Sequence, residues 1–144
     1  MKAAATKRLV LDASVTLAWC FADESTAYTE GVLDLLATGT EAVAPAIWPF
    51  EVANALLMAE RRKRITVAQV TSMLQRIVDL PINVEPIRVD RAFGQILAAA
   101  REEKLTEYDA AYLELAMRKG WPLASLDEQL KQSARSAGVS LVRI

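Results

Sequence analysis

The sequence predicts an α/β fold in which a mainly parallel central sheet is flanked by helices, within one domain over residues 1–144. Short apolar segments alternate with helical patterns along the chain, an order typical of βαβ units. The 144 residues are 53% hydrophobic and 24% charged, as expected of one globular domain with a sizeable core. No linker, repeat or low-complexity segment divides the sequence.

Two strands and the helices between them are predicted in the first third of the chain. The apolar segment that ends at Asp12 reads as a buried strand. Residues with helical periodicity follow, and Gly39 is suited to end the second of these helices. In order, we expect a strand at Leu9–Leu11, helices at Thr16–Phe21 and about Glu24–Ala37, and a strand at Ala42–Ala44.

Capping residues define the helices in the middle of the chain. Pro49 suits the first position of a helix, and Thr66 with Gln69 has the spacing of a capping box. Pro81 follows the end of that second helix, and Asp90 is suited to cap a third. We therefore expect helices that run to about Arg62 and about Val78, a strand at Ile82–Val89, and a helix at Arg91–Glu103.

Similar features mark the last third of the chain. Thr106 is suited to cap a helix, and Gly120 to end it. Gly138 ends a further helix. We expect a helix at Glu107–Lys119, a strand at Leu123–Leu126 that ends at Asp127, a helix to about Ser136, and a strand at Val139–Val142.

The composition limits the chemistry that the protein can perform. There are 17 Lys and Arg against 18 Asp and Glu, no His, and one cysteine, Cys20. The usual nitrogen and sulfur ligands of zinc are therefore missing, and a single cysteine fits a reducing compartment. Because no uncharged segment approaches the roughly 18 residues of a membrane span, we expect a soluble, cytoplasmic protein.

Four acids lie among residues that belong in a core: Asp12, Glu51, Asp109 and Asp127. Two follow predicted strands and two lie in the first turns of predicted helices, positions that share one edge of a parallel sheet. Two carboxylates roughly 4 Å apart repel by about 4 kcal/mol at an effective dielectric near 20. Mg²⁺ or Mn²⁺, which bind oxygen ligands, would relieve this repulsion and activate water against a phosphodiester.

Each acid also has a structural interpretation. Glu51 suits the start of a helix, Asp109 can partner Thr106 in a cap, and Asp127 can be an N-cap. Asp12 is harder to explain in this way, because a strand end inside an apolar segment is a poor place for a solvated charge. The residues alone leave these alternatives open.

The four segments resemble the PIN-domain nucleases, and most of all the VapC toxins of toxin–antitoxin pairs. The resemblance covers about residues 9 to 144. It rests on four motifs in order: LDASV with Asp12 and Ser14, PFEVANAL with Glu51 and Asn54, LTEYDAAYLELA with Thr106, Tyr108, Asp109 and Tyr112, and LASLDEQL with Ser125 and Asp127.

This resemblance implies Mg²⁺- or Mn²⁺-dependent cleavage of RNA. It implies that Asp12, Asp109 and Asp127 bind the metal directly, and that Glu51 binds directly or through water. Ser125, where relatives often have Thr, would orient ligands or water. The implied partners are a cognate antitoxin protein, in a groove near the helices that follow Asp12 and Glu51, and a second copy of the chain in a homodimer.

Several neighbouring residues have more than one interpretation. Asn54 lies on the helix face of Glu51 and is expected to hold Glu51 or an RNA phosphate, or else to make a buried structural hydrogen bond. Ser14 has no His to activate it and is expected to cap the next helix. The basic segment 61–64 favours a solvated helix end over a phosphate-binding rim. We expect core packing for Cys20, Trp48, Phe50 and Trp121.

Two other functions were weighed. A haloacid-dehalogenase-like phosphotransferase needs a second Asp where Ser14 stands, and a receiver domain needs an acidic pair near Asp12. A non-catalytic binding module on the PIN fold would be expected to have lost acids, and none of the four is missing.

Overall fold

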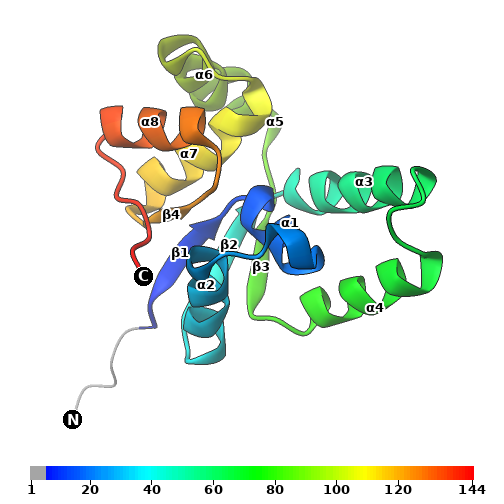
Figure 1. Cartoon of the computed structure of the whole chain (residues 1–144). Helices are drawn as coiled ribbons and strands as arrows, with labels where there is room; N and C mark the ends of the chain where they lie inside the picture. Colours follow the sequence, from blue (N-terminus) through cyan, green and yellow to red (C-terminus); the bar gives the residue numbers. More distant parts are fainter. Residues whose placement is uncertain (1–5) are drawn as a thin grey trace.

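The computed structural model describes residues 6–144 and contains a four-stranded sheet in the order β3-β2-β1-β4. All three strand pairings are parallel, so the predicted α/β class is confirmed. In Figure 1 the strands run upward from the label N, and α1 and α3 begin near their carboxyl ends. The strands are β1 (Arg8–Leu11), β2 (Glu41–Pro45), β3 (Ile82–Glu85) and β4 (Leu123–Ala124).

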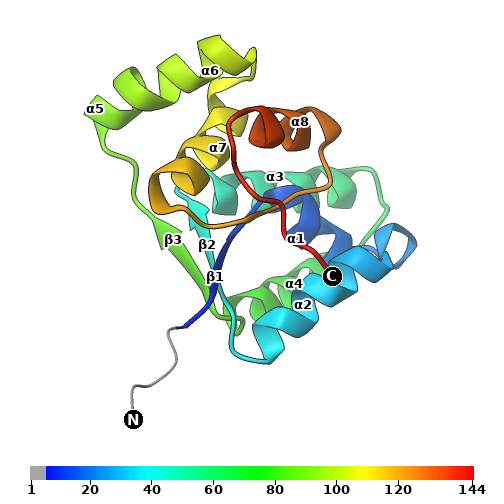
Figure 2. The same cartoon turned by 90° about the vertical axis from the view of Figure 1, so that its left-hand side faces the viewer.

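Helices surround the sheet and gather beyond the carboxyl ends of the strands (Figure 1 and, turned by 90°, Figure 2). Within residues 6–144, no helix is long and apolar enough to cross a membrane. The helices are α1 (Ala13–Cys20), the 3₁₀ turn η1 (Ala22–Glu24), α2 (Ala27–Ala37), α3 (Trp48–Arg61), α4 (Val67–Val78), α5 (Val89–Arg91), the π-helical segment η2 (Ala92–Ile96), α6 (Leu97–Glu103), α7 (Glu107–Lys119) and α8 (Glu128–Ser136).

The core forms between the sheet and helix α7, which packs against β1, β2 and β4. Leu9, Val10 and Leu11 of β1 are all buried, and so are Tyr112 and Leu113 of α7. An apolar strand buried on both faces is typical of a parallel sheet covered by helices. Burial of α7 fixes the position of its first turn, which carries Asp109.

The predicted caps are largely confirmed. Thr66 and Gln69 form both bonds of a capping box at the start of α4, and Thr106 accepts a hydrogen bond from the backbone N–H of Asp109. Gly120 and Gly138 adopt φ values of 69° and 78°, a left-handed conformation that glycine tolerates best. These signals are local, and the backbone follows them.

Three predicted elements are wrong in extent. The strand expected at Ile82–Val89 ends at Glu85, before a proline that has no N–H to donate to a sheet. The strand expected at Leu123–Leu126 ends at Ala124. The strand expected at Val139–Val142 is only an isolated bridge between Leu141 and Leu123.

Three helix starts also differ from the prediction, and one of these helices, α2, begins at Ala27 rather than at about Glu24. Helix α1 begins at Ala13, directly after Asp12, rather than at Thr16. Asp90 does not cap its helix, because the helix begins at Val89 and Asp90 instead accepts a hydrogen bond from Arg88 Nε at 3.1 Å. At Asp90 this side-chain contact takes the place of the expected cap.

Candidate functional site

Adjacent strands β1 and β4 bring Asp12 and Ser125 together at the carboxyl edge of the sheet. Asp12 is only 6% exposed, and its Oδ2 accepts hydrogen bonds from Ser14 Oγ at 2.6 Å and Ser125 Oγ at 2.8 Å. Each serine hydroxyl in turn accepts a backbone N–H, from Leu126 for Ser14 and from Asp127 for Ser125. Both hydroxyls are therefore oriented to donate to one oxygen of Asp12.

The prediction that Ser14 caps a helix is wrong. Ser14 lies inside α1, and the first turn of that helix has no side-chain cap. Its hydroxyl instead joins Asp12 to the loop after β4, a contact between residues 112 positions apart. No local pattern indicates this contact, because the partner lies near the other end of the chain.

Helices α3 and α7 meet in a hydrogen bond between Glu51 and Tyr112. The Tyr112 hydroxyl donates to Glu51 Oε1 at 2.7 Å. Tyr112 is fully buried, whereas Glu51 is partly exposed. Burial and the neighbouring carboxylate of Glu51 raise the pKa of Tyr112, so its hydroxyl stays protonated and can donate. Sequence reasoning assigned no role to Tyr112, although it lies one turn after Asp109 on the same helix.

Asp109 and Asp127 both lie at helix starts. Asp109 is partly buried, and its backbone N–H donates to Thr106 Oγ1 in the cap at 3.1 Å. Asp127 is exposed and is the N-cap of α8, where its Oδ1 accepts the N–H of Leu130 at 2.9 Å. The capping interpretations of the two aspartates are therefore correct, and the cap of Asp127 engages only one of its two carboxylate oxygens.

The four acids share one electrostatic environment. Burial is the largest cause that raises the pKa values of Asp12, Glu51 and Asp109. Neighbouring acids raise them further: Asp127 acts on Asp12, and both Asp12 and Asp127 act on Asp109. No Lys or Arg is among the causes for these three groups. Electrostatic effects therefore link the four predicted acids, whose role as one site stays a prediction.

The donor atoms of this site fit a hard divalent cation. They are carboxylate and hydroxyl oxygens, the ligands that Mg²⁺ and Mn²⁺ prefer. Within residues 6–144, no three acidic, His or Cys side chains stand close enough to form a ready-made metal cluster. Mg²⁺ usually keeps several waters and binds through one or two carboxylates, so the looser spacing suits a cation held partly through water.

Other predicted residues lie at the margins of the site. Asn54 is exposed, so the expectation of a buried hydrogen bond is wrong. Phe50 is 78% exposed, so its predicted core packing is also wrong. Trp48 is buried and donates from Nε1 to Thr16 Oγ1, and Cys20 is buried, as predicted. Trp121 is partly buried.

The basic segment after α3 divides into two parts. Arg61, Arg62 and Lys63 are exposed, as expected of a solvated helix end. Arg64 instead bonds Asp23 through Nη2 at 2.9 Å, and its guanidinium lies 4.0 Å from the centre of the Phe21 ring. Arg64 therefore links the turn between α3 and α4 to the segment that follows α1.

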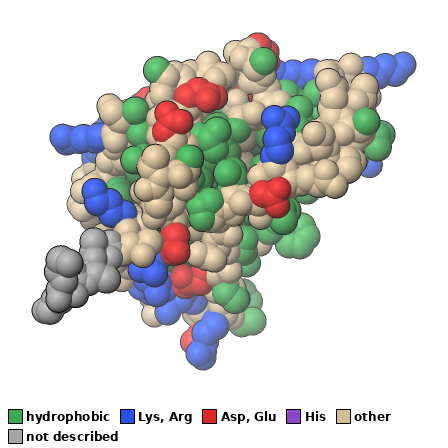
Figure 3. Space-filling view, turned by 90° about the horizontal axis from the view of Figure 1, so that it is seen from below, with side chains coloured by type: hydrophobic (Ala, Val, Ile, Leu, Met, Phe, Trp, Pro, Cys, Tyr) green, Lys and Arg blue, Asp and Glu red, His purple; other side chains and the backbone are tan. Residues whose placement is uncertain are grey.

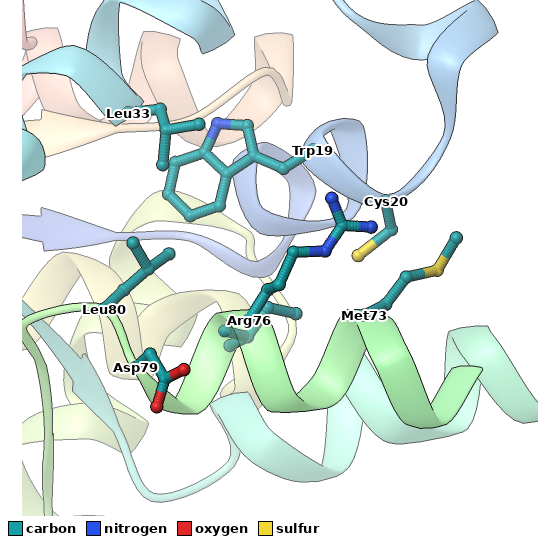
Figure 4. Close-up of a pocket in the computed structure, with 8 residues that line it drawn as sticks. Trp19, Cys20, Leu33, Met73, Arg76, Asp79 and Leu80 are labelled. Atoms are coloured by element: carbon teal, nitrogen blue, oxygen red, sulfur yellow. The ribbon is translucent and has the colours of Figure 1, made fainter. Parts of the chain in front are cut away.

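A pocket of about 320 Å³ lies between α1, α2 and α4, away from the four acids. Its walls are mainly apolar and include Trp19, Leu33 and Met73, with Arg76 and Asp79 at the α4 side (Figure 4). The lower face of the molecule carries an apolar area surrounded by charged side chains (Figure 3).

Residues 9–136 match the family model of the PIN domain. The chain belongs to the PIN domain family. This PIN domain also shares its fold with solved structures of low sequence identity. PAE2754 from Pyrobaculum aerophilum is 22% identical with a TM-score of 0.68, over 89% of this chain and 79% of that one.

Two further structures come from toxin–antitoxin proteins. VapBC2 from Rickettsia felis, bound to a promoter DNA fragment, is 12% identical with a TM-score of 0.66, over 94% of this chain and 97% of that one. VapC20 from Mycobacterium tuberculosis, a toxin that cleaves the sarcin–ricin loop, is 18% identical with a TM-score of 0.63, over 94% and 99%. No curated protein matches the sequence. Membership of the PIN family rules out the haloacid-dehalogenase and receiver families.

Proposed function

We propose that this PIN domain is a divalent-metal-dependent ribonuclease, and that Asp12, Glu51, Asp109 and Asp127 form its active site. The observation that carries the proposal is that the acids raise one another's pKa values, while no Lys or Arg of residues 6–144 is among the causes of the shifts at Asp12, Glu51 and Asp109. A binding module without metal would gain nothing from uncompensated carboxylates. A cation at this site would balance their charge.

Each residue then has a defined part. Asp12, Asp109 and Asp127 hold Mg²⁺ or Mn²⁺, and Glu51 holds it directly or through water. The hydroxyls of Ser14 and Ser125 fix Asp12, and Thr106 caps the helix that carries Asp109. When bound, the cation supplies an activated water and compensates phosphate charge. Exposed Asn54, one turn after Glu51 on α3, is placed to contact an RNA phosphate.

Cleavage of RNA with and without metal tests this proposal. Purified protein should cleave total RNA in Mn²⁺ or Mg²⁺ and lose that activity in EDTA. Adding back Mn²⁺ beyond the chelator should restore cleavage. Full cleavage in EDTA would contradict metal-dependent chemistry.

We also propose that the protein is the toxin of a toxin–antitoxin pair. The fold similarity to VapBC2 and VapC20 supports this role. The antitoxin would bury an apolar segment in the pocket between α1, α2 and α4. The antitoxin groove is expected near the helices that follow Asp12 and Glu51, which are α1 and α3. The pocket lies beside α1 as expected, but its other wall is α4 rather than α3.

A pair of α4 variants tests the antitoxin site. Met73→Glu places a charge in the apolar pocket, whereas Ser72→Glu places it on the exposed neighbouring position. Co-expression with the neighbouring reading frame should yield a complex with the wild type and Ser72→Glu but not with Met73→Glu. Equal complex formation by both variants would contradict this placement.

The family resemblance also implies a homodimer. Sedimentation of the isolated protein tests this second partner.

A further inference from the structure

The hydrogen bond between Tyr112 and Glu51 joins a rigid side chain to a flexible one. Tyr112 is fully buried in the main core, so its ring position is fixed by packing. Glu51 is partly exposed, and its neighbours Phe50 and Asn54 are exposed to solvent. A glutamate has more rotatable bonds than an aspartate, so Glu51 has freedom to leave the site unless it is held.

Electrostatic repulsion favours such a departure. Asp12 and Asp109 are both close enough to Glu51 to raise its pKa. Without a bound cation, an extended Glu51 side chain would lie in water, away from the other acids. The Tyr112 hydroxyl opposes this movement, because it donates to Glu51 Oε1 at 2.7 Å and hydrogen bonds to charged groups are the stronger kind.

The bond also selects which oxygen of Glu51 faces the site. Within residues 6–144, Oε1 is engaged by Tyr112 and no hydrogen bond reaches Oε2. The same arrangement holds at Asp12, where both serine hydroxyls donate to Oδ2. One oxygen of each carboxylate is thus held by the protein, and the other is left for a cation or its water.

We propose that Tyr112 is a positioning residue that holds Glu51 in the site and leaves Oε2 to the metal or to a metal-bound water. The inference rests on the proposed function, because it requires a cation at the four acids. Groups that orient metal ligands typically change metal affinity by 10- to 100-fold when they are removed. Loss of the Tyr112 hydroxyl should therefore weaken Mn²⁺ binding about tenfold.

The test is a double-mutant cycle read out by Mn²⁺ calorimetry on the metal-free protein. Tyr112→Phe should weaken Mn²⁺ binding about tenfold, whereas in a Glu51→Ala background the same substitution should change nothing. Tyr28→Phe is the matched control. Tyr28 lies on helix α2, and its hydroxyl donates to the Val142 carbonyl. That control should bind Mn²⁺ as the wild type does.

The outcomes separate this inference from the proposed function. Wild-type protein that binds no Mn²⁺ overturns both. Wild-type binding with unchanged affinity in Tyr112→Phe, or an equal loss in the Glu51→Ala background, overturns only the role of Tyr112. Should Tyr112→Phe fail to fold, Glu51→Asp draws the carboxylate back from the hydroxyl and should lose affinity to a similar degree; unchanged affinity there overturns the inference.

Discussion

Ser125 donates its hydroxyl hydrogen bond to Asp12 Oδ2 at 2.8 Å, and the two residues are 113 positions apart in the chain. The same hydroxyl accepts the N–H of Asp127. One buried serine therefore links the strand ends of β1 and β4 and sets the position of two of the four acids.

Removing that hydroxyl should destabilise the fold. Ser125→Ala leaves the Asp127 N–H without its acceptor and Asp12 with one donor, which should lower the free energy of unfolding by about 1–2 kcal/mol. Urea unfolding in EDTA measures this. Ser133→Ala is the control, because Ser133 is also buried and no side-chain hydrogen bond of its hydroxyl is found in residues 6–144; equal losses in both variants would contradict the assigned role.

Asp12→Asn should stabilise the metal-free protein. Both serine hydroxyls donate to the same oxygen, so the amide oxygen of Asn can accept both while the buried charge disappears. The free energy of unfolding should rise by about 1 kcal/mol, as is common when a functional site loses its strain. Mn²⁺ should raise the Tm of the wild type and raise that of the variant less.

The exposed Asp34 on α2 provides the control for this charge removal. Asp34→Asn should leave both the Tm and its response to Mn²⁺ unchanged. A metal-free Asp12→Asn protein that is less stable than the wild type would show that the carboxylate is a structural acceptor rather than a strained site.

The stability advantage of Asp12→Asn should depend on pH. Burial raises the pKa of Asp12 above the ordinary value of an aspartate, so the folded wild type takes up a proton at a pH where the unfolded chain does not. This contribution to stability is present at low pH and is lost as the pH rises through the folded pKa. The gap in Tm between variant and wild type should therefore narrow on acidification from pH 7 in EDTA. A Tm difference that widens on acidification would contradict a raised pKa of Asp12 in the folded protein.

Removing a second buried acid, Glu114, should destabilise the protein, because two arginines compensate its charge. Glu114 Oε1 accepts hydrogen bonds from Arg91 Nη1 at 2.7 Å and Arg118 Nε at 2.9 Å. Glu114→Ala would leave both guanidinium groups without this partner and should cost about 3 kcal/mol in urea unfolding. Exposed Glu102 on α6 is the control, and Glu102→Ala should change stability by under about 0.5 kcal/mol.

Features that depend on local sequence signals are predicted well, whereas features that depend on tertiary contacts are predicted less well. The capping box of Thr66 and Gln69 was predictable, because both residues act within one helical turn. The strand expected at Val139–Val142 failed, because its pairing with β4 is limited to Leu141 and no local pattern encodes that limit. The end of β3 at Glu85 is different, because Pro86 is a local signal that limits a strand and the predicted strand at Ile82–Val89 continued past it.

At the site, the four acids stand out in the sequence by their apolar surroundings and the motifs around them, and their role as site residues stays a prediction. Their hydrogen-bond partners do not stand out. Ser14 is predicted to cap a helix, but its hydroxyl donates to Asp12 and accepts the N–H of Leu126 in the loop after β4, a contact that no local pattern indicates. Tyr112 has no predicted role, and its hydroxyl meets Glu51 across 61 positions of chain. Asp12 was the acid with the poorest structural explanation, and it is the most buried of the four.

The central claim is that the acids cleave RNA with a bound metal, and Asp109→Asn tests it most directly. The cap of Thr106 uses the backbone N–H of Asp109, so the variant should keep its helix start and lose only the charged oxygen. In Mn²⁺ the wild type should cleave total RNA, and Asp109→Asn should be at least about a hundredfold slower. Asp90→Asn, in an exposed acid outside the site, should cleave at the wild-type rate. Cleavage by Asp109→Asn at the wild-type rate would contradict the account.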